Sequence, residues 1–580
     1  MLERGGALAV LVAVLYAWLA CPYVTENDTA EFATLGALGG IAHPSGYPAY
    51  VLWLRLWSWL PGSSPAHTAA LATAILGVAQ VLVLHAACRA WGARALAATL
   101  AVGVYAVAPL VVRYNTSAEA FALNNLVAAL VVWLAAAGGP LQGWLRAGML
   151  GLVAGLGLAN HMTCALVAPI GLLGVIRGCC ERPAWPGAVA VGVGFALGLA
   201  PYVYLFVAPD HLMSWRSPTT ISDLAEIVLR RVYGGPFGFS SLGQEVAWSD
   251  HVAEFVRTLG RAWLWVLPFV GVTAVVVRLR RSDQGEPRAE WLALAVTLVL
   301  AGPLLVARFD MQLDAMGLWT VRRFHLLPML LVTIPVAVGL DLAGAALARY
   351  LDVSPLFRRC APLFVSLVLA AAAVSSLPYV QRFHSPAMEL AVRNTLRSLP
   401  PQAVVIGVID ELDVGFRYLQ LARGERPDVV FVRWQTAHWD WYRSKLDRAG
   451  LHLEIGAGDV RAQIAAQVHA LGRPLFGAVN QAAADIPGYD RYPYGVLMHI
   501  LPHGVRAPSL DEVVRINREL FGRFALDYAF PGLHDDWATA VHVGYAILWR
   551  RLGDALDRAG QATRAAEAYE LADRLAPSRR

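Results

Sequence analysis

Long apolar runs separated by short charged loops dominate the chain between Leu8 and Leu377. A helix needs about 20 apolar residues to cross the hydrocarbon core of a bilayer, and these runs reach that length. Runs bounded by charge, scored in windows of about 19 residues, predict about eleven spans. Their centres lie near Val12, Gly77, Val104, Val127, Val153, Ala168, Val193, Phe269, Val296, Thr333 and Leu369. We therefore predict a polytopic all-α membrane bundle.

The least regular part of this pattern lies between Gly148 and Ile176. The polar pair Asn160-His161 interrupts an otherwise apolar stretch there. It predicts either a tight turn between two short helices or a polar spot within one bent helix.

After Leu377 the apolar runs stop, and the remaining ~200 residues have the size and pattern of a soluble α/β domain. "AVVIGVID" and "DVVFVRW" are typical of buried strands, and "DEVVRINRELFGRF" is typical of an amphipathic helix. The last stretch, "LGDALDRAGQATRAAEAYELADRLAP", has the small and aromatic spacing of one tetratricopeptide-like (TPR-like) helical hairpin. We expect three parts: a transmembrane domain over 1–378, an extracytoplasmic α/β domain over 379–545 and a TPR-like hairpin over 546–580.

Composition agrees with a membrane protein, because 57% of the 580 residues are hydrophobic and 15% are charged. The net charge of +5 comes almost entirely from arginine, since Lys445 is the only lysine. The soluble part has no basic cluster with interleaved aromatic residues, so we expect no nucleic-acid partner. All six cysteines lie in or beside apolar segments without metal-type spacing, which leaves the soluble domain without a disulfide.

Arginine placement in short loops predicts a cytoplasmic N-terminus. The strongest inward anchor is "RLRRSDQGEPR" at 278–288. An odd number of spans then places the C-terminal domain and the loops that contain the unusual polar residues together on the outer face. An alternative, in which the first span is a signal peptide, is less favoured because the Trp before Leu19 fits the lipoprotein-like box "WLAC" poorly. The inner-loop arginines are Arg4, Arg89, Arg94, Arg146, Arg177, Arg182, Arg278, Arg280, Arg281, Arg288, Arg349, Arg358 and Arg359.

Two acids follow the first span in "TENDTAEFATLGALGGIAHPSGYP". Asp28 and Glu31 are three residues apart, so they share one face of a helical turn. One interpretation is a capping role, in which Asn27, Asp28 or Thr29 starts an interfacial helix. Against it, a carboxylate at a membrane boundary is costly unless it is paired or used. Partial desolvation also makes a carboxylate a better general base, which favours a catalytic role.

The turn "HPSGYP" carries His43 and Tyr47 and is stiffened by its two prolines, while Gly46 permits a positive φ. The aromatic stretch that follows, "YVLWLRLWSWLP", is too short to span a bilayer and is expected to lie in the interface. We expect this loop to form a re-entrant lid over a membrane-level cavity.

Other polar residues are further candidates for binding. Glu119 could pair with an arginine or hold an acceptor, or it could be a helix N-terminal acid. His161, beside Asn160, could orient a carboxylate or hydrogen-bond within the bundle. A divalent metal held by His161 and the two first-loop acids is compatible with these residue types, but their spacing does not require one. "DELD" at 410–413 follows a predicted strand, which is a common ligand position in α/β folds, but we expect a solvated loop there.

Several of these motifs together resemble one family. An acidic loop after the first span, followed by H-P-x-G-Y-P, is similar to a bacterial membrane family, formerly of unknown function, that is related to eukaryotic transmembrane protein O-mannosyltransferases. That family is part of the GT-C class of polytopic glycosyltransferases. The family usually has a second proline where this chain has Ser45, and we expect Pro44 and Pro48 to keep the turn stiff. Weaker matches follow in order: "SAEAFALNN" (117–125), "GLGLANHMT" (155–163), "WRSPTT" (215–220), and "RPDVVFV" with "WY" (426–442).

The resemblance implies a GT-C-like fold in a bacterial inner membrane, a polyprenyl-phosphate sugar donor with mannose as the expected sugar, and a protein or glycan hydroxyl as acceptor. It also points to the first-loop acid, Asp28, as the catalytic base, with Glu31 assisting. The departing lipid phosphate needs positive charge, which arginine supplies through a bidentate fork. Arg322 and Arg323 are the leading candidates, although any single arginine could instead snorkel towards lipid head groups. The expected substrate-binding residues are His43, Tyr47, Glu119, Asn160, His161, Arg322 and Arg323, with Arg308, Arg216, Arg230 and Arg231 also available.

An inverting glycosyltransferase is therefore the leading prediction, and a transporter or flippase of a lipid-linked saccharide is the main rival. A transporter would favour internal repeats and broken helices in matching halves, and neither is evident in the sequence. A receptor with a ligand-binding outer domain would leave the first-loop acids unexplained.

Overall fold

The computed structural model describes residues 2–180, 184–235, 246–280, 288–350, 355–407, 410–478, 485–532 and 536–576. The described chain divides into two compact units. The first, here called the helical unit, comprises Met1–Pro22, Ile41–Ala208 and Ser217–Arg382. The second, here called the α/β unit, comprises Tyr23–Gly40, Pro209–Arg216 and Phe383–Arg580. Arg182 and residues 281–287 of the predicted inward anchor lie outside the described residues.

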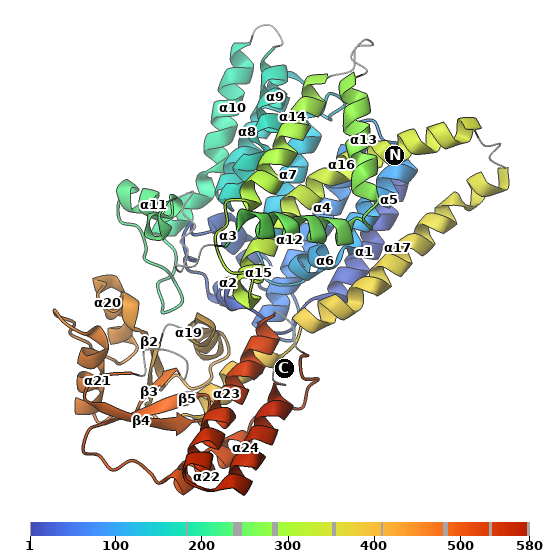
Figure 1. The fold of residues 1–580 in the computed structure, drawn as a ribbon. Helices are drawn as coiled ribbons and strands as arrows, with labels where there is room; N and C mark the ends of the chain where they lie inside the picture. The colour runs from blue at the N-terminus through green and yellow to red at the C-terminus, as the bar shows by residue number, and fades with distance from the viewer. Residues whose placement is uncertain are drawn as a thin grey trace. The chain divides into compact units, whose positions relative to one another are not determined.

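The helical unit is built from apolar helices, several of which run side by side in one bundle (Figure 1). Contacts join α8 to α7, α9 and α10, and α9 to α14. The helices are α1 (Leu2–Leu19), α3 (Pro48–Leu56), α4 (Pro65–Ala90), α5 (Ala95–Val107), α6 (Pro109–Asn115), α7 (Phe121–Ala135), α8 (Gly143–Leu158), η1 (Met162–Val167), α9 (Ala168–Cys179), α10 (Trp185–Gly198), η2 (Ala200–Phe206), α11 (Ile221–Val228), η3 (Arg231–Tyr233), α12 (Trp248–Ala262), α13 (Leu267–Arg280), α14 (Arg288–Val299), η5 (Leu300–Leu304), α15 (Ala315–Arg322), η6 (Arg323–His325), α16 (Leu326–Tyr350) and α17 (Pro355–Phe383).

A helix lies at each predicted span centre, and the chain is a multi-pass membrane protein. Among the described residues, 5 helices are long and apolar enough to cross a membrane, or 7 if each of two bent helix pairs is one span. The bent pairs are α5 with α6, at 68°, and α12 with α13, at 97°. Three further apolar helices are shorter: Gly5–Leu19, Phe121–Ala135 and Gly143–Leu158. The predicted count of about eleven spans is therefore not confirmed, because several predicted spans form short or bent helices.

The polar pair Asn160-His161 is a turn between two helices, which is the first of the two alternatives. Helix α8 ends at Leu158, η1 begins at Met162, and α8 packs against α9. The His161 ring accepts a hydrogen bond from the Thr163 N–H at 3.2 Å and so caps η1. The turn thus keeps a polar side chain fixed inside an apolar bundle.

Helices α8 and α10 approach closely because glycines line their contact. A Cβ atom at Gly155 would lie 2.3 Å from the carbonyl oxygen of Phe195, and one at Gly194 would lie 2.1 Å from that of Gly148. Small residues allow membrane helices to pack backbone against backbone in this way. The GxxxG sequence at Gly194 and Gly198 therefore lies at the contact between α8 and α10.

The α/β unit contains one five-stranded sheet with the order β2-β1-β3-β5-β4. Strand β1 pairs in parallel with β2 and β3, whereas β5 runs antiparallel to β3 and β4. Pro493 lies in β4, an edge strand, where a missing ladder donor is tolerated. The strands are β1 (Val404–Gly407), β2 (Val430–Arg433), β3 (Leu475–Ala478), β4 (Tyr489–Tyr494) and β5 (Leu497–Pro502).

Helices complete this unit around two apolar cores. One core joins the sheet to α20 and α21, and the other joins α18 to α22, α23 and α24. Helices α23 and α24 form a hairpin in which Tyr569 lies against Gly553, and its TPR-like character stays a prediction. The helices are α2 (Asn27–Leu38), α18 (Ala387–Ser398), α19 (Asp410–Arg417), η7 (Tyr418–Ala422), η8 (Trp434–Thr436), α20 (Asp440–Arg448), α21 (Val460–Ala470), α22 (Leu510–Phe521), α23 (Trp537–Arg558) and α24 (Ala562–Leu575).

Two features of this unit differ from simple expectation. Residues 209–216, here called the strap, pack with the α/β unit together with α2, although both lie far from it in sequence. The predicted loop "DELD" is instead the start of α19, and Asp413 is buried with ion pairs to Arg417 and Arg433. The prediction of a solvated loop is wrong because these arginines satisfy the buried carboxylate. The side chains of Asp410 and Glu411 lie outside the described part of the chain.

Candidate functional site

The "HPSGYP" turn brings two predicted binding residues next to a third. Gly46 has φ 89° and Tyr47 has φ 45°, and Pro48 begins α3. The ring of Tyr47 lies 4.9 Å from that of His43 and 5.7 Å from that of His161. The positive φ expected at Gly46 is present, and the turn places its aromatic side chains in the helical unit.

His161 lies among aromatic rings from other helices. Its ring centroid is 4.9 Å from that of Phe121 and 6.0 Å from that of Phe324. Nearby, Asn160 donates a hydrogen bond to the Ala120 carbonyl at 3.1 Å. These contacts agree with the prediction that His161 and Asn160 hydrogen-bond within the bundle, and they hold the ring in one place.

Positive charge gathers around this histidine. The guanidinium groups of Arg230 and Arg323 and the side chain of His43 interact electrostatically with His161, and we call these four residues the cationic cluster after its two arginines. The Arg323 guanidinium lies 4.1 Å from the centre of the Trp319 ring. Stacking on an aromatic face holds an arginine in place while it keeps its charge. The cluster is therefore suited to bind an anion.

The two neighbouring arginines have different surroundings. Arg322 is held by Glu254, with Nε and Nη2 each 2.8 Å from the same carboxylate oxygen. Glu254 is buried. Arg323 instead lies over the rings of Trp319 and Phe121. Both arginines of the predicted pair stay candidates for holding an incoming anion. The sequence reasoning missed Glu254, although it lies on the buried side of the amphipathic helix α12.

Glu119 is 1% exposed and lies just before α7, whose N-cap is Ala120. This position is compatible with both predictions for Glu119, the helix-terminal acid and the binding residue. Burial of an acid to this degree favours a specific role over simple solvation.

The first-loop acids lie on helix α2 in the α/β unit. Carboxylate oxygens of Asp28 and Glu31 lie within 4.8 Å of each other. The Thr29 hydroxyl accepts hydrogen bonds from the N–H groups of Thr25 and Glu26, each at 3.0 Å, and Glu26 is the N-cap. Helix α2 thus begins at Asn27, its N-cap is Glu26 rather than one of the three predicted residues, and Asp28 is the acid expected in its first turn. Two carboxylates on one turn are also a usual partial ligand set for a hydrated divalent cation, so the optional metal stays a prediction.

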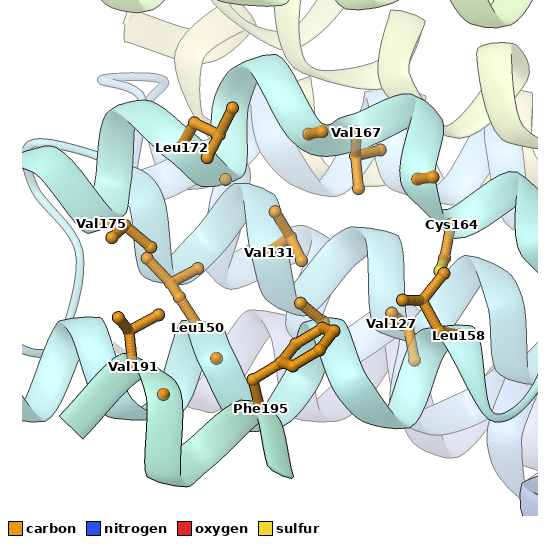
Figure 2. A pocket seen from close by; sticks show the side chains of 16 residues that line it. Val127, Val131, Leu150, Leu158, Cys164, Val167, Leu172, Val175, Val191 and Phe195 are labelled. Atoms are coloured by element: carbon orange, nitrogen blue, oxygen red, sulfur yellow. The ribbon is translucent and has the colours of Figure 1, made fainter. Parts of the chain in front are cut away.

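An apolar cavity of about 520 Å³ lies among α7, α8, η1, α9 and α10 (Figure 2). Leu158 and Cys164 mark one end of it, and Leu172, Val175 and Val191 surround the other. Leu158 and Cys164 flank the Asn160-His161 turn in sequence. An apolar slot therefore ends beside the turn that carries His161, one residue of the cationic cluster. Its lining residues are Val127, Val131, Leu150, Gly151, Ala154, Leu158, Cys164, Ala165, Val167, Ala168, Gly171, Leu172, Val175, Val191, Gly192 and Phe195.

Residues 28–179 match the family model of the Protein O-mannosyl-transferase TMEM260 N-terminal domain. The chain is 26% identical to the Protein O-mannosyl-transferase TMEM260 of Mus musculus over 473 residues, which cover 77% of this chain and 66% of the mouse protein. It is 19% identical to the corresponding tmem260 protein of Dictyostelium discoideum over 481 residues, covering 75% of this chain and 58% of that protein. The matches thus span less than two thirds of either relative's length.

Two crystal structures of ArnT from Cupriavidus metallidurans are also similar in fold. The one bound to undecaprenyl phosphate has a TM-score of 0.48 and 14% identity, and the apo one has 0.45 and 13%. Each alignment covers 87% of this chain and 99% of the other. Likeness at this level carries no functional conclusion for this chain. The sequence matches, in contrast, relate it to the TMEM260 protein O-mannosyl-transferases, as its motifs indicated.

Proposed function

We propose that this protein is a GT-C-like membrane glycosyltransferase that moves a sugar, with mannose as the expected one, from a polyprenyl-phosphate donor to a hydroxyl group of a protein or glycan. One observation carries the proposal: an apolar cavity ends beside the turn that holds His161, the residue around which the cationic cluster is defined. A lipid phosphate has an apolar tail and an anionic head, so it needs both environments in this order. The names of the relatives support sugar transfer and mannose as the sugar.

In this proposal the cationic cluster holds the donor phosphate. Negative charge grows on the phosphate as its bond to the sugar C1 breaks, and fixed positive charge stabilises that transition state. Arg323 and Arg230 supply permanent charge, while His161 and Tyr47 shape the site around them. The apolar cavity accepts the first part of the polyprenyl tail.

Asp28 is proposed as the general base. It takes the proton of the acceptor hydroxyl as that oxygen attacks C1, and the phosphate leaves with the electron pair of the broken bond. A single displacement of this kind inverts the configuration at C1. Support comes from the position of Asp28 in the first turn of α2, close to the Glu31 carboxylate, and from the match of this loop to the family's first-loop acid. Glu31, on the same helical turn, is proposed to assist.

We further propose a bacterial inner-membrane location with a cytoplasmic N-terminus and an extracytoplasmic α/β unit. The arginine distribution supports this orientation. A flippase for a lipid-linked saccharide is the alternative, since it would also need a cationic site and an apolar slot. The flippase hypothesis gives no role to the two first-loop acids, which favours the transferase.

Turnover tests the base. The purified protein is incubated with radiolabelled polyprenyl-phosphate mannose and a pool of serine- and threonine-containing peptides, and products are identified by mass spectrometry. Asp28→Asn is nearly isosteric, so donor binding should persist while turnover falls ~10²–10⁴-fold. Near-parental turnover of a folded Asp28→Asn protein would refute this assignment.

Donor binding tests the cluster and the cavity with matched pairs. Arg323→Lys keeps the charge but loses the planar fork and should weaken donor binding, whereas Arg322→Lys, already held by Glu254, should weaken it less. Val191→Trp fills the cavity and should also weaken binding. Val189→Trp on the same helix is the control, because Val189 is 53% exposed. Unchanged donor affinity in both Arg323→Lys and Val191→Trp would place the donor elsewhere.

A further inference from the structure

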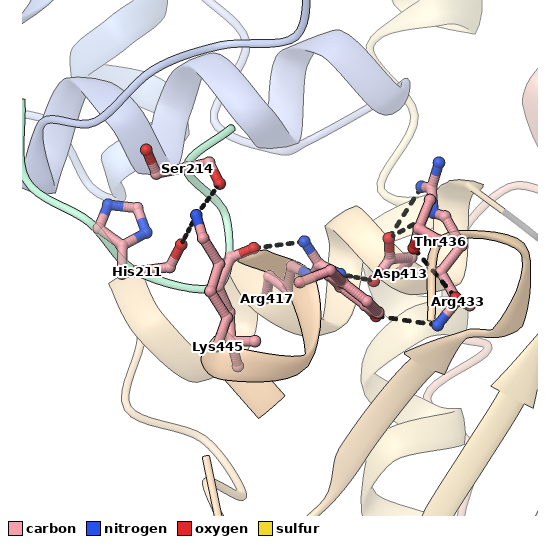
Figure 3. Close-up of polar contacts among 9 residues, drawn as sticks. His211, Ser214, Asp413, Arg417, Arg433, Thr436 and Lys445 are labelled. Atoms are coloured by element: carbon pink, nitrogen blue, oxygen red, sulfur yellow. Dashed lines mark hydrogen bonds and ion pairs between the residues drawn. The ribbon is translucent and has the colours of Figure 1, made fainter. Parts of the chain in front are cut away.

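The only lysine of the chain is buried in the α/β unit against the strap. Lys445, on α20, is 4% exposed. Its ammonium group donates hydrogen bonds to the carbonyl oxygens of His211 at 3.1 Å and Trp215 at 3.3 Å, and also to that of Ser214. Asp210 lies 2.6 Å from the same nitrogen. Figure 3 shows the Lys445 side chain reaching the strap between His211 and Ser214. All of these partners belong to the strap.

A second cation holds the strap at a neighbouring point. Arg417, on α19, donates to the carbonyl of Leu212 and pairs with Asp413 at 2.7 Å. Asp413 also pairs with Arg433 at the end of β2, at 2.8 Å (Figure 3). The strap is thereby connected to the sheet through buried, paired charges. Such a network is rigid because every member has a partner.

Aromatic side chains also pack against the strap. The ring of Trp215 lies 5.3 Å from that of Trp441 and 6.1 Å from that of Trp439, and the latter two stack at 5.5 Å. The motifs "WRSPTT" and "WY", which the sequence offered without a role, are therefore two sides of one contact.

The strap in turn holds the helix that bears the acids. The His211 ring lies 3.0 Å from the carbonyl oxygen of Gly39, the C-cap residue of α2. Gly40 follows with φ 115°, and a Cβ there would lie 3.0 Å from His211 Nε2 and 3.2 Å from Ser214 Cβ. No larger residue fits at this approach. The strap thus lies between Lys445 and the C-terminal end of α2.

The other end of α2 is held within the same unit. The Val24 N–H donates to a carboxylate oxygen of Glu389 on α18 at 3.0 Å, and Glu389 pairs with Arg393 at 2.9 Å. Helix α2 also packs directly on α19 and η7. Both ends and one side of α2 are therefore fixed by the C-terminal part of the chain.

We propose that Lys445 is a positioning residue for α2: through the strap it fixes the backbone of the helix that carries Asp28 and Glu31. The inference rests on the proposed function for the role of those acids. Lysine suits this position because an ammonium group has three donors and meets three carbonyl oxygens, whereas a planar guanidinium directs its donors differently. The carbonyls it holds are all in the strap, so we expect its loss to loosen the strap first.

Hydrogen exchange of the full-length protein tests whether Lys445 positions α2 through the strap, and it needs no measurement of turnover. Lys445→Met keeps the aliphatic stem and removes the charge, so amides 27–38 should exchange about tenfold faster or more, the change expected when one buried hydrogen-bonded group is left unsatisfied. Arg448→Met is the matched control, because Arg448 also pairs with Asp210, at 2.5 Å, but its side chain is 55% exposed. It should leave α2 protection unchanged.

A second variant keeps the test decisive if Lys445→Met does not fold. His211→Ala removes the ring that contacts the Gly39 carbonyl while the Lys445 contacts to the strap backbone remain. It should also speed exchange in α2. Parental exchange of α2 in either variant, with the protein folded, overturns the inference.

Turnover then separates this inference from the proposed function. In Lys445→Met, kcat should fall with little change in the KM for donor, since only the acids are displaced, and Lys445→Arg should restore part of kcat. If the amides of α2 exchange faster in Lys445→Met while Asp28→Asn retains turnover, the proposed base is wrong and the positioning role of Lys445 is supported. If α2 is unaffected while Asp28→Asn is inactive, the proposed function stands and the positioning role is refuted.

Discussion

Asp413 is the residue whose loss should destabilise the α/β unit most clearly. Its side chain is 2% exposed and lies 2.7 Å from Arg417 and 2.8 Å from Arg433. Asp413→Asn removes the negative charge and leaves two arginines facing a neutral amide. Breaking a buried ion pair by removing one partner costs about 3–5 kcal/mol, because the remaining charge is uncompensated.

The chain provides a matched control for this change. Asp440 pairs with Arg443, but the Asp440 side chain is 94% exposed. Asp440→Asn removes a surface ion pair and a helix N-terminal acid, which together should cost about 1 kcal/mol or less. Both changes convert one aspartate to asparagine in the same unit, and they differ in the burial of the carboxylate and in the number of arginines that it pairs with.

Thermal challenge followed by brief proteolysis measures the difference on the full-length protein in detergent, with the C-terminal fragment detected through a tag. For a unit of roughly 200 residues, 1 kcal/mol corresponds to about 2–4 °C in Tm. Asp413→Asn should therefore lower the midpoint by roughly 6–20 °C, and Asp440→Asn by about 4 °C at most. Equal shifts for the two variants would refute the claim that the Asp413 network organises this unit.

Three further predictions follow from the other features. Gly155→Ala, whose Cβ would lie 2.3 Å from the Phe195 carbonyl oxygen, should force α8 and α10 apart and lower the Tm, whereas Gly192→Ala, with no atom within 4 Å of its Cβ, should not. Alkaline phosphatase fused after Pro400 should be active, and green fluorescent protein fused at the same point should not fluoresce. Bright cytoplasmic fluorescence would contradict the proposed orientation. Burial lowers the pKa of Lys445 to about 8 from 10.5, against the attraction of Asp210 and with Arg417 and Arg448 adding to the fall. Between pH 8 and 10.5 the unfolded chain therefore binds more protons than the folded chain, so the free energy of unfolding rises with pH across that window. Over the same window the Lys445 side chain loses its charge, and with it the charged contact to the strap beside His211. Turnover should fall above about pH 8 without a fall in Tm, and Lys445→Arg should remove this alkaline limb.

Local patterns were sufficient to predict the elements that depend on local chemistry. The apolar runs located a helix at each span centre, and the apolar stretches at 403–410 and 428–434 became β1 and β2. The proline and glycine spacing of "HPSGYP" predicted a turn, and Gly46 has the positive φ that it permits. In each case the residues that decide the structure are neighbours in sequence.

Elements decided by distant partners were not predictable in this way. "DELD" was expected to be solvated, and nothing within it shows that Arg433 lies opposite Asp413. Helix α2 was expected to belong with the membrane spans, because its partner His211 in the strap lies 172 residues after Gly39 and α19 lies still later in the sequence. The pairing of Arg322 with Glu254 has the same origin, since the two are 68 residues apart. Burial of charge depends on such partners, and a single sequence does not reveal them.

The α/β unit combines segments that are synthesised at different times, so its assembly depends on the order of synthesis. Helix α2 leaves the ribosome long before α19 and Lys445, which are made only after more than 370 further residues. At about 5–20 residues per second, the acid-bearing helix waits on the order of 20–70 seconds for the surface on which it packs. During that interval α1 and the following spans can enter the membrane while α2 remains uncommitted. A chain truncated before α20 would therefore insert its spans and still lack the fixed acids, so assembly of the site waits for the synthesis of α20.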